Sequence, residues 1–174
     1  YLRADASRIA HWRARLTELC PPTGRRVGLV WAGSASHAND FARSTRLATL
    51  APMLDAPDIV WIALQKGGPE AEIAGHWGRS VILNIGAEIG DFDDTMAVLS
   101  LLDLVISVDT SVIHIAGAMG RPAWMLTPFR ADWRWGLAGE QTPWYPSLRI
   151  KRQQAPGDWA GLARAVGDAL SDLA

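Results

Sequence analysis

Four side chains suited to chemistry stand close together between residues 107 and 122, in the stretch SVDTSVIHIAGAMGRP. Asp109 ends an apolar, strand-like run, and the hydroxyls of Thr110 and Ser111 follow it directly. His114 lies four residues after Thr110, so a helix that begins here places both on one side. A helix N-terminus offers free backbone N–H groups and a positive dipole end. The stretch therefore predicts an anion site where a strand meets a helix, with Asp109 as a possible cap.

The same stretch also fits a structural role. The small residues from 116 to 120 would let the helix pack closely, as a capped core helix whose histidine is bonded to the backbone. Two cations at other strand ends favour the anion site, Arg43 in the loop WAGSASHANDFARST and Lys66 in QKGG. Arginine can grip phosphate oxygens with two nitrogens, and one diphosphate would explain both cations and the hydroxyls. Each cation could instead be a solvated surface charge.

Short apolar runs alternate with helical patterns and must position these residues. Strands are expected at 27–31, 59–64, 81–85, 104–108, 122–126 and 148–152; helices are expected at 5–19, 47–54, 69–77, 94–102 and 158–173, and directly after Thr110. Apolar strands that are each followed by a helix predict a parallel sheet covered on both faces. We expect an α/β fold, a Rossmann-like doubly wound sheet of about six strands in three α/β/α layers. Ligands of such sheets bind beyond the carboxyl ends of the strands.

Composition limits the class of protein. The 174 residues suit one domain, 1–174, in which 1–22 form a leading helix and linker and 26–174 the core. A net charge of -1 gives no electrostatic case for nucleic acid, and Asp103 interrupts the longest apolar stretch, which excludes a membrane span. The single cysteine, Cys20, cannot form an internal disulfide, so we expect a cytoplasmic protein. Because the first residue is Tyr1, we expect a piece of a longer polypeptide.

Other loops at the predicted carboxyl edge add candidates. The turn after the first strand has one glycine, Gly33, so the G-x-G-x-x-G fingerprint of a simple NAD-dependent dehydrogenase is missing. Its hydroxyls include Ser34. Asp93 precedes a helical run and is interpreted as its N-cap. The loop after the fifth strand holds Asp132 and Arg134 among four aromatic residues, Trp133, Trp135, Trp144 and Tyr145, which could stack on a base or sugar or close the end of the sheet.

Four stretches carry a family resemblance: VGLVWAGSASHANDFARSTRL, LQKGGPEAEI, GDFDDTMAVLSLLDLVISVDTSVIHIAGAMGRPAWML and DWRWGLAGEQTPWYPSLRI. They resemble the glycosyltransferase-like domain that follows tetratricopeptide repeats in many bacterial proteins. That domain is similar to the carboxyl-terminal half of ADP-heptose:lipopolysaccharide heptosyltransferases, which have the two-domain GT-B fold. The narrower likeness rests on Asp109, Thr110 and His114, and Ser111 stands where the family has glycine.

The resemblance implies the donor-binding half of a bacterial glycosyltransferase that needs no metal or cofactor, and no cluster spaced for a metal is evident. The implied partners are a nucleotide-diphosphate sugar and, in the parent chain, tetratricopeptide repeats or an acceptor domain. Together with the residues above, it implies these nucleotide-sugar-binding residues: Gly33, Ser34, Arg43, Gln65, Lys66, Asp109, Thr110, Ser111, His114, Asp132 and Trp133. Arg43, Lys66 and His114 are the candidates for a catalytic role, which stays unassigned.

Two other functions stay open from the sequence. The domain could be a transferase-like binding or scaffold module without turnover. It could also belong to a nucleotide-sugar epimerase of the same two-domain architecture.

Overall fold

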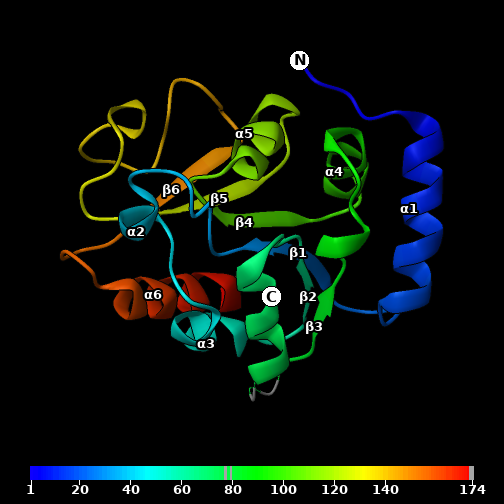
Figure 1. Cartoon of the computed structure of the whole chain (residues 1–174), viewed down its shortest axis with the longest axis horizontal. Coiled ribbons are helices and arrows are strands. Elements are labelled where there is room, and N and C mark those ends of the chain that lie inside the picture. The colour runs from blue at the N-terminus through cyan, green and yellow to red at the C-terminus, as the bar shows by residue number, and fades with distance from the viewer. Residues whose placement is uncertain (77, 79, 173–174) are drawn as a thin grey trace.

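The six apolar segments form one parallel sheet in the order β3-β2-β1-β4-β5-β6 (Figure 1). This arrangement comes from a computed structural model, which describes residues 1–76, 78 and 80–172. In chain order the elements are α1 (Ala6–Leu19), β1 (Arg25–Val30), α2 (Asp40–Arg43), η1 (Leu47–Leu50), α3 (Ala51–Leu54), β2 (Ile59–Ala63), η2 (Gly68–Gly75), β3 (Ile82–Asn84), η3 (Gly86–Glu88), α4 (Phe92–Leu99), β4 (Leu104–Val108), α5 (Ser111–Ala118), β5 (Ala123–Thr127), η4 (Trp133–Trp135), β6 (Leu148–Arg152) and α6 (Trp159–Ser171), where η marks a 3-10 helix.

The predicted doubly wound sheet is confirmed. Strands β4 and β6 have the predicted bounds, and the other four are shifted by one or two residues at their ends. All five residues of β4 are buried, as the run without polar alternation indicated. Since every pair of neighbouring strands is parallel, all the carboxyl ends reach the same edge of the sheet.

Helices cover both faces of the sheet and enclose a core on each (Figure 1). On one face α1, α4 and α5 bury residues such as Trp12, Leu99 and Ile113 against the strands. On the other face α3 and α6 bury Met53 and Val166. The fold therefore has the three α/β/α layers that the sequence predicted.

The first helix packs into the core rather than standing apart. Asp5 is its N-cap, since the carboxylate accepts hydrogen bonds from the backbone N–H groups of Ser7 and Arg8. Trp12 and Leu16, four residues apart, are buried on one face of the helix. This face lies against α4.

The prediction that Asp93 caps α4 is wrong. The cap is Asp91, whose carboxylate accepts the N–H of Asp94 at 2.8 Å, so the helix begins two residues earlier than predicted. It also ends earlier, at Leu99, because the N–H groups of Leu101 and Leu102 bond to carbonyls only three residues back, in a turn that leads to β4.

Two other predicted helices take different forms. The predicted helix 47–54 is split into η1 and α3, with Pro52 at the start of α3, where its missing N–H is tolerated. The predicted helix 69–77 is the 3-10 segment η2, which ends at Gly75; its predicted last residue, Trp77, lies outside the described residues, as does Leu173 of the last helix. The sequence did not predict the short helix α2 in the polar loop.

The strand order places a topological switch between β1 and β4. From β1 the chain builds outward to β2 and β3, then crosses back to β4 on the other side of β1. The loops after β1 and β4 therefore leave the sheet in opposite directions and open a crevice at its carboxyl edge.

Candidate functional site

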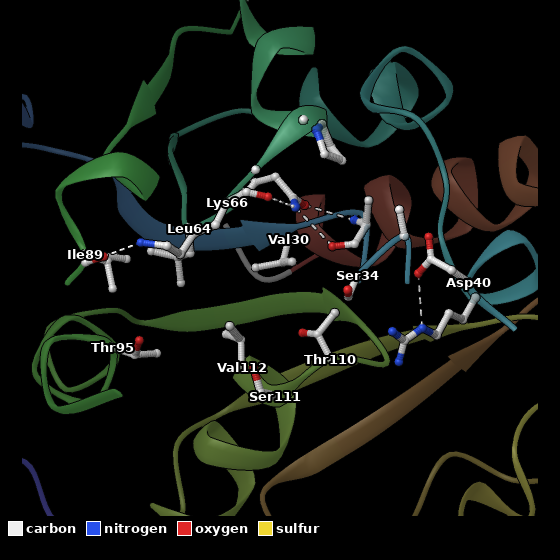
Figure 2. A pocket seen from close by; sticks show the side chains of 18 of the residues that line it. Val30, Ser34, Asp40, Leu64, Lys66, Ile89, Thr95, Thr110, Ser111 and Val112 are labelled. Atoms are coloured by element: carbon white, nitrogen blue, oxygen red, sulfur yellow. Dashed lines mark hydrogen bonds and ion pairs between the residues drawn. The ribbon is translucent and has the colours of Figure 1, made fainter. Parts of the chain in front are cut away.

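A cavity of about 580 Å³ lies at the switch point (Figure 2). Its walls come from the loop after β1, the loop after β2, the η3–α4 segment and the start of α5. In Figure 2, Ser34 and Asp40 lie toward one end, Ile89 and Thr95 toward the other, and Thr110, Ser111 and Val112 lie along one side.

The loop after β1 is held by its own polar side chains. The N–H of Gly33 donates to Ser44 Oγ at 2.9 Å, and that hydroxyl donates to Asp40 Oδ1 at 2.8 Å. Asp40 Oδ1 also accepts from Arg43 Nε at 3.3 Å. The sequence analysis missed Asp40, although its three-residue spacing from Arg43 in a helical turn was a readable signal.

Arg43 spans the cavity from the first loop to the fourth. Its Nη1 donates to the Asp109 carbonyl at 2.9 Å, across the switch point. Its Nη2 lies beside Gly33, where a Cβ would stand 2.5 Å from that nitrogen. Gly33 is therefore required by the close approach of the guanidinium. The charge of Arg43 is partly offset by Asp40, and both side chains are more than four-fifths buried.

Gln65 is a buried side chain that bonds to the backbone of the cavity walls. Its Oε1 accepts the N–H groups of Trp31 and Ala32 at 3.1 and 2.9 Å, and its Nε2 donates to the carbonyls of Ala32 and Lys66. The side chain is 2% exposed and its amide is fully used. Gln65 lines the cavity but holds its backbone walls in place.

Lys66 lies on the same wall. Its ammonium donates to the carbonyl of Gly86 at 3.1 Å and to the carbonyl of Ile89. The lysine thus joins the loop after β2 to the segment before α4.

The prediction that Asp109 caps α5 is wrong. Thr110 is the N-cap residue, without a side-chain bond to the helix; its Oγ1 lies 3.0 Å from Ser107 Oγ. Thr110 and Ser111 both line the cavity at the helix start, so the predicted placement of these hydroxyls at an available N-terminus holds.

Asp109 points instead into a cluster away from the cavity lining. Its Oδ2 accepts the indole N–H of Trp135 at 2.9 Å, and its Oδ1 lies 3.4 Å from His114 Nε2. His114 Nδ1 in turn lies 3.1 Å from the Tyr145 hydroxyl. Burial raises the pKa of Asp109, but the contacts with His114 and Trp135 outweigh it and leave the pKa below its ordinary value.

Tyr145 explains one small residue of α5, Gly117. A Cβ on Gly117 would overlap the Tyr145 ring, so the glycine creates the space in which that ring lies on the helix. The ring nitrogens of His114 face two side chains, Tyr145 of the loop after β5 and Asp109 of the turn before α5, in place of the backbone partner that a core histidine would have.

The structure divides the predicted binding residues into two groups. Seven line the cavity: Gly33, Ser34, Arg43, Gln65, Lys66, Thr110 and Ser111. Four lie outside its lining: Asp109, His114, Asp132 and Trp133. Asp132 accepts the N–H of Arg134 as the cap of η4, and Trp133 is 75% exposed with the Arg134 guanidinium over its ring.

The sequence analysis missed the apolar part of the cavity. Val30, Leu64, Ile89, Phe92 and Val112 line it. In the sequence, Val30, Leu64 and Val112 fit ordinary strand or helix positions, and Ile89 and Phe92 stand in the loop expected between 85 and 94. Their convergence depends on the crossover between β3 and β4, which no local pattern specifies.

Neither a metal cluster nor a membrane helix is evident in the described residues. Within 1–76, 78 and 80–172, no three His, Cys, Asp or Glu side chains are grouped so that they could hold a metal ion. Over the same part of the chain, no helix has the length and apolarity that crossing a bilayer requires.

Comparison with known proteins shows which family has this sequence and fold. The chain matches glycosyltransferase family 9 (heptosyltransferase) over residues 9–126. Among curated proteins it is 35% identical to Protein FlbA of Caulobacter vibrioides over 178 residues, which covers 100% of the chain and 29% of FlbA. The chain thus spans less than a third of this relative's length.

Solved structures share the fold at low identity. E. coli ADP-heptose lps heptosyltransferase II matches with a TM-score of 0.62 and 13% identity, over 99% of this chain and 53% of the enzyme. A family 9 glycosyl transferase from Veillonella parvula matches with a TM-score of 0.64 and 12% identity, over 100% and 54%. E. coli heptosyltransferase WaaC, solved with ADP-2-deoxy-2-fluoro heptose, matches with a TM-score of 0.56 and 18% identity, over 93% and 47%. The family match covers more than half of the sequence, and the chain belongs to glycosyltransferase family 9.

Proposed function

We propose that this domain binds the nucleotide-diphosphate sugar donor of a bacterial glycosyltransferase that works without a metal ion. The observation that carries the proposal is the cavity at the switch point, where the N-terminus of α5, two hydroxyls and two cationic side chains meet. The solved relative WaaC was crystallised with an ADP-sugar analogue, which supports the same ligand class.

The two ends of the cavity suit the two ends of such a ligand. The phosphates lie at the start of α5, where Thr110 and Ser111 donate hydrogen bonds and Arg43 approaches from the first loop. The base lies toward Ile89 and Phe92, which provide apolar surface. Lys66 adds a second positive charge on the wall.

These groups also replace a metal ion in the chemistry. When the glycosidic bond to the donor phosphate breaks, negative charge grows on the leaving diphosphate. Arg43 and the helix dipole are already oriented around that position and stabilise the charge without rearranging, and Lys66 adds positive charge to the wall of the same cavity.

The rest of the activity resides elsewhere in the parent protein. Two of the matched structures, heptosyltransferase II and the Veillonella parvula glycosyl transferase, are about twice the length of this chain, which covers 53% and 54% of them. An acceptor domain, tetratricopeptide repeats or both accompany this domain in a cytoplasmic protein. Residues 1–174 alone then bind donor but do not transfer sugar at a useful rate, because a separately held acceptor and base supply much of the rate enhancement.

Calorimetric titration with nucleoside diphosphates tests the proposal. Loss of one charge-assisted hydrogen bond costs roughly 1.5–3 kcal/mol, so Arg43→Ala weakens binding about 10- to 100-fold. Thr110→Val keeps the volume but loses the hydroxyl, a loss of about 1 kcal/mol. Arg164→Ala is the matched control: it removes an exposed arginine of α6 that lies outside the cavity lining, and we expect it not to weaken binding.

Two results would count against the proposal. Binding that is unchanged in both Arg43→Ala and Thr110→Val places the phosphates elsewhere. Failure of the wild type to bind any nucleoside diphosphate favours a module that has lost its donor site.

A further inference from the structure

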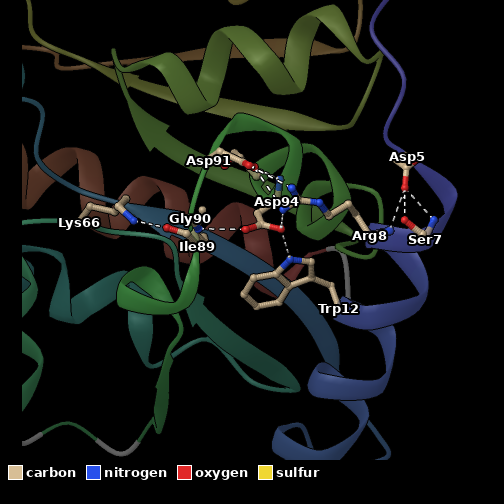
Figure 3. A network of polar contacts seen from close by, with 10 residues as sticks. Asp5, Ser7, Arg8, Trp12, Lys66, Ile89, Gly90, Asp91 and Asp94 are labelled. Atoms are coloured by element: carbon tan, nitrogen blue, oxygen red, sulfur yellow. Dashed lines mark hydrogen bonds and ion pairs between the residues drawn. The ribbon is translucent and has the colours of Figure 1, made fainter.

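A path of hydrogen bonds runs from Lys66 in the cavity wall through one peptide group and Asp94 to the N-terminal helix (Figure 3). The carbonyl of Ile89 accepts a hydrogen bond from the Lys66 ammonium, and the next N–H, that of Gly90, donates to Asp94 Oδ2 at 2.9 Å. This carbonyl and this N–H belong to the same planar unit. The orientation of this peptide group that lets its N–H bond to Asp94 therefore also points its carbonyl at Lys66.

Asp94 is fixed by α1. Its Oδ1 accepts the indole N–H of Trp12 at 3.1 Å and Arg8 Nη1 at 2.5 Å. Asp94 is only 8% exposed, so its carboxylate depends on these donors in place of water. A second contact between α1 and the same segment is the pair of Arg15 and Glu88 at 2.8 Å.

The charges along this path alternate. The positive Lys66 faces the carbonyl end of the peptide dipole, and the negative Asp94 faces its N–H end, with the positive Arg8 behind the carboxylate (Figure 3). In a partly buried chain of this kind each bond polarises the next. Removing the carboxylate therefore weakens the bond at the far end, between Ile89 and Lys66.

We propose that Asp94 is a positioning residue for Lys66, and that α1 sets the place of this cation on the cavity wall through the Ile89–Gly90 peptide group. The consequence for donor binding rests on the function proposed above. The consequence for the lysine itself does not depend on any ligand.

The chain offers a direct probe because it contains only two lysines, Lys66 and Lys151. In protein labelled with ¹⁵N at the lysine side chains, NMR follows each ammonium group and its proton exchange with water. Lys151, which pairs with Glu140 at 3.0 Å, is the internal reference, and Lys66→Arg assigns the two signals. Coupling through a structural network is typically 0.5–2 kcal/mol, so Asp94→Asn speeds exchange at Lys66 roughly 2- to 30-fold and leaves Lys151 unchanged.

A pair of tryptophan variants separates positioning from general loss of stability. Trp12→Phe removes the indole donor from Asp94 and keeps a buried ring. Trp61→Phe removes an equally buried indole donor, bonded to the Leu54 carbonyl at 3.0 Å, on the other face of the sheet. We expect Trp12→Phe to change the Lys66 signal and Trp61→Phe to leave it unchanged. If Asp94→Asn does not fold, the comparison of the Lys66 signal in these two tryptophan variants tests the proposal.

Titration with a nucleoside diphosphate adds the functional readout. Asp94→Asn and Trp12→Phe weaken binding roughly 2- to 30-fold, and Trp61→Phe does not. A Lys66 signal that is the same in wild type, Asp94→Asn and Trp12→Phe overturns the positioning role, even if the nucleotide binds. Wild-type protein that binds no nucleotide overturns the proposed function, while the NMR comparison still decides the role of Asp94.

Discussion

Trp135 donates its indole N–H to the carboxylate of Asp109 at 2.9 Å, although 26 residues separate them in the chain. The bond ties the loop after β5 to the turn after β4, whose other side borders the cavity. His114 completes this arrangement, with its ring centroid 5.2 Å from that of Trp135 and its Nε2 3.4 Å from Asp109. His114 thus contacts the turn after β4 on the side away from the cavity.

Trp135→Phe tests this support. The substitution removes the hydrogen bond to the partly buried Asp109 carboxylate and replaces a buried indole with a smaller ring. We expect the free energy of unfolding to fall by about 1–3 kcal/mol, measured by urea denaturation at pH 7. Trp31→Phe, which shortens an equally buried indole whose N–H has no hydrogen-bond partner, is the control and should be less destabilising by about 1 kcal/mol. Equal effects in the two variants would contradict the assigned role.

Gly117→Ala tests the packing of Tyr145 on α5. In an open helix interior alanine is more favourable than glycine by about 1 kcal/mol. Here the added Cβ meets the Tyr145 ring, so we expect destabilisation of about 1–3 kcal/mol instead. Gly68→Ala, where a Cβ meets no atom within 4 Å, serves as the control. Thermal melts of the two variants give the sign, and stabilisation by Gly117→Ala would refute the contact.

Much of the fold could be predicted because strands and helices are specified by short sequence patterns. The apolar run Leu104–Val108 gave the bounds of β4, and the alternating stretch Leu148–Arg152 gave those of β6. The placement of the strand ends at one edge follows from parallel pairing. The error at Asp93 has an equally local cause. Three aspartates, at 91, 93 and 94, precede or begin the helix, and each could serve as a cap by residue type alone. The backbone conformation at Asp91 decided between them.

Only part of the candidate site could be predicted, because which predicted residues share the cavity depends on contacts between segments that are distant in the sequence. Sequence placed Thr110 and Ser111 at a helix start, and they line the cavity there. It also grouped Asp109 and His114 with them, since spacing along a helix says nothing of which neighbour a side chain meets. That neighbour is the loop after β5, through Trp135 and Tyr145. The path from Asp94 to Lys66 was likewise hidden, because it runs through one backbone peptide group.

Removal of divalent metal ions with EDTA tests the proposal that the donor binds without a metal ion. The cavity presents guanidinium, ammonium and hydroxyl groups, and its one carboxylate, Asp40, is paired with Arg43. We expect the affinity for a nucleoside diphosphate to be the same in excess EDTA as in millimolar Mg²⁺, measured by calorimetry at one ionic strength. A tenfold or larger loss in EDTA would show that a metal ion takes part.

Acid unfolding tests the charge on Asp94. Burial raises the pKa of this carboxyl, but hydrogen bonds from Trp12, Gly90 and Arg8 outweigh it and lower the pKa from 3.8 to about 2. A folded-state pKa below the unfolded value stabilises the protein above the unfolded value, and this stability is lost as the pH falls through the folded one. A shift of this size corresponds to about 2 kcal/mol.

The comparison of wild type with Asp94→Asn isolates that contribution. At pH 7 the variant lacks the paired charge and is the less stable protein. As the pH falls from about 5 to about 2, the wild type loses the Asp94 contribution and the variant has none to lose, so the stability difference shrinks by about 2 kcal/mol. Asp93→Asn, an exposed carboxylate on the same helix, should stay within about 1 kcal/mol of wild type across this range. Urea denaturation at four pH values measures the difference, and a constant gap between wild type and Asp94→Asn would mean that the charge of Asp94 does not stabilise the fold.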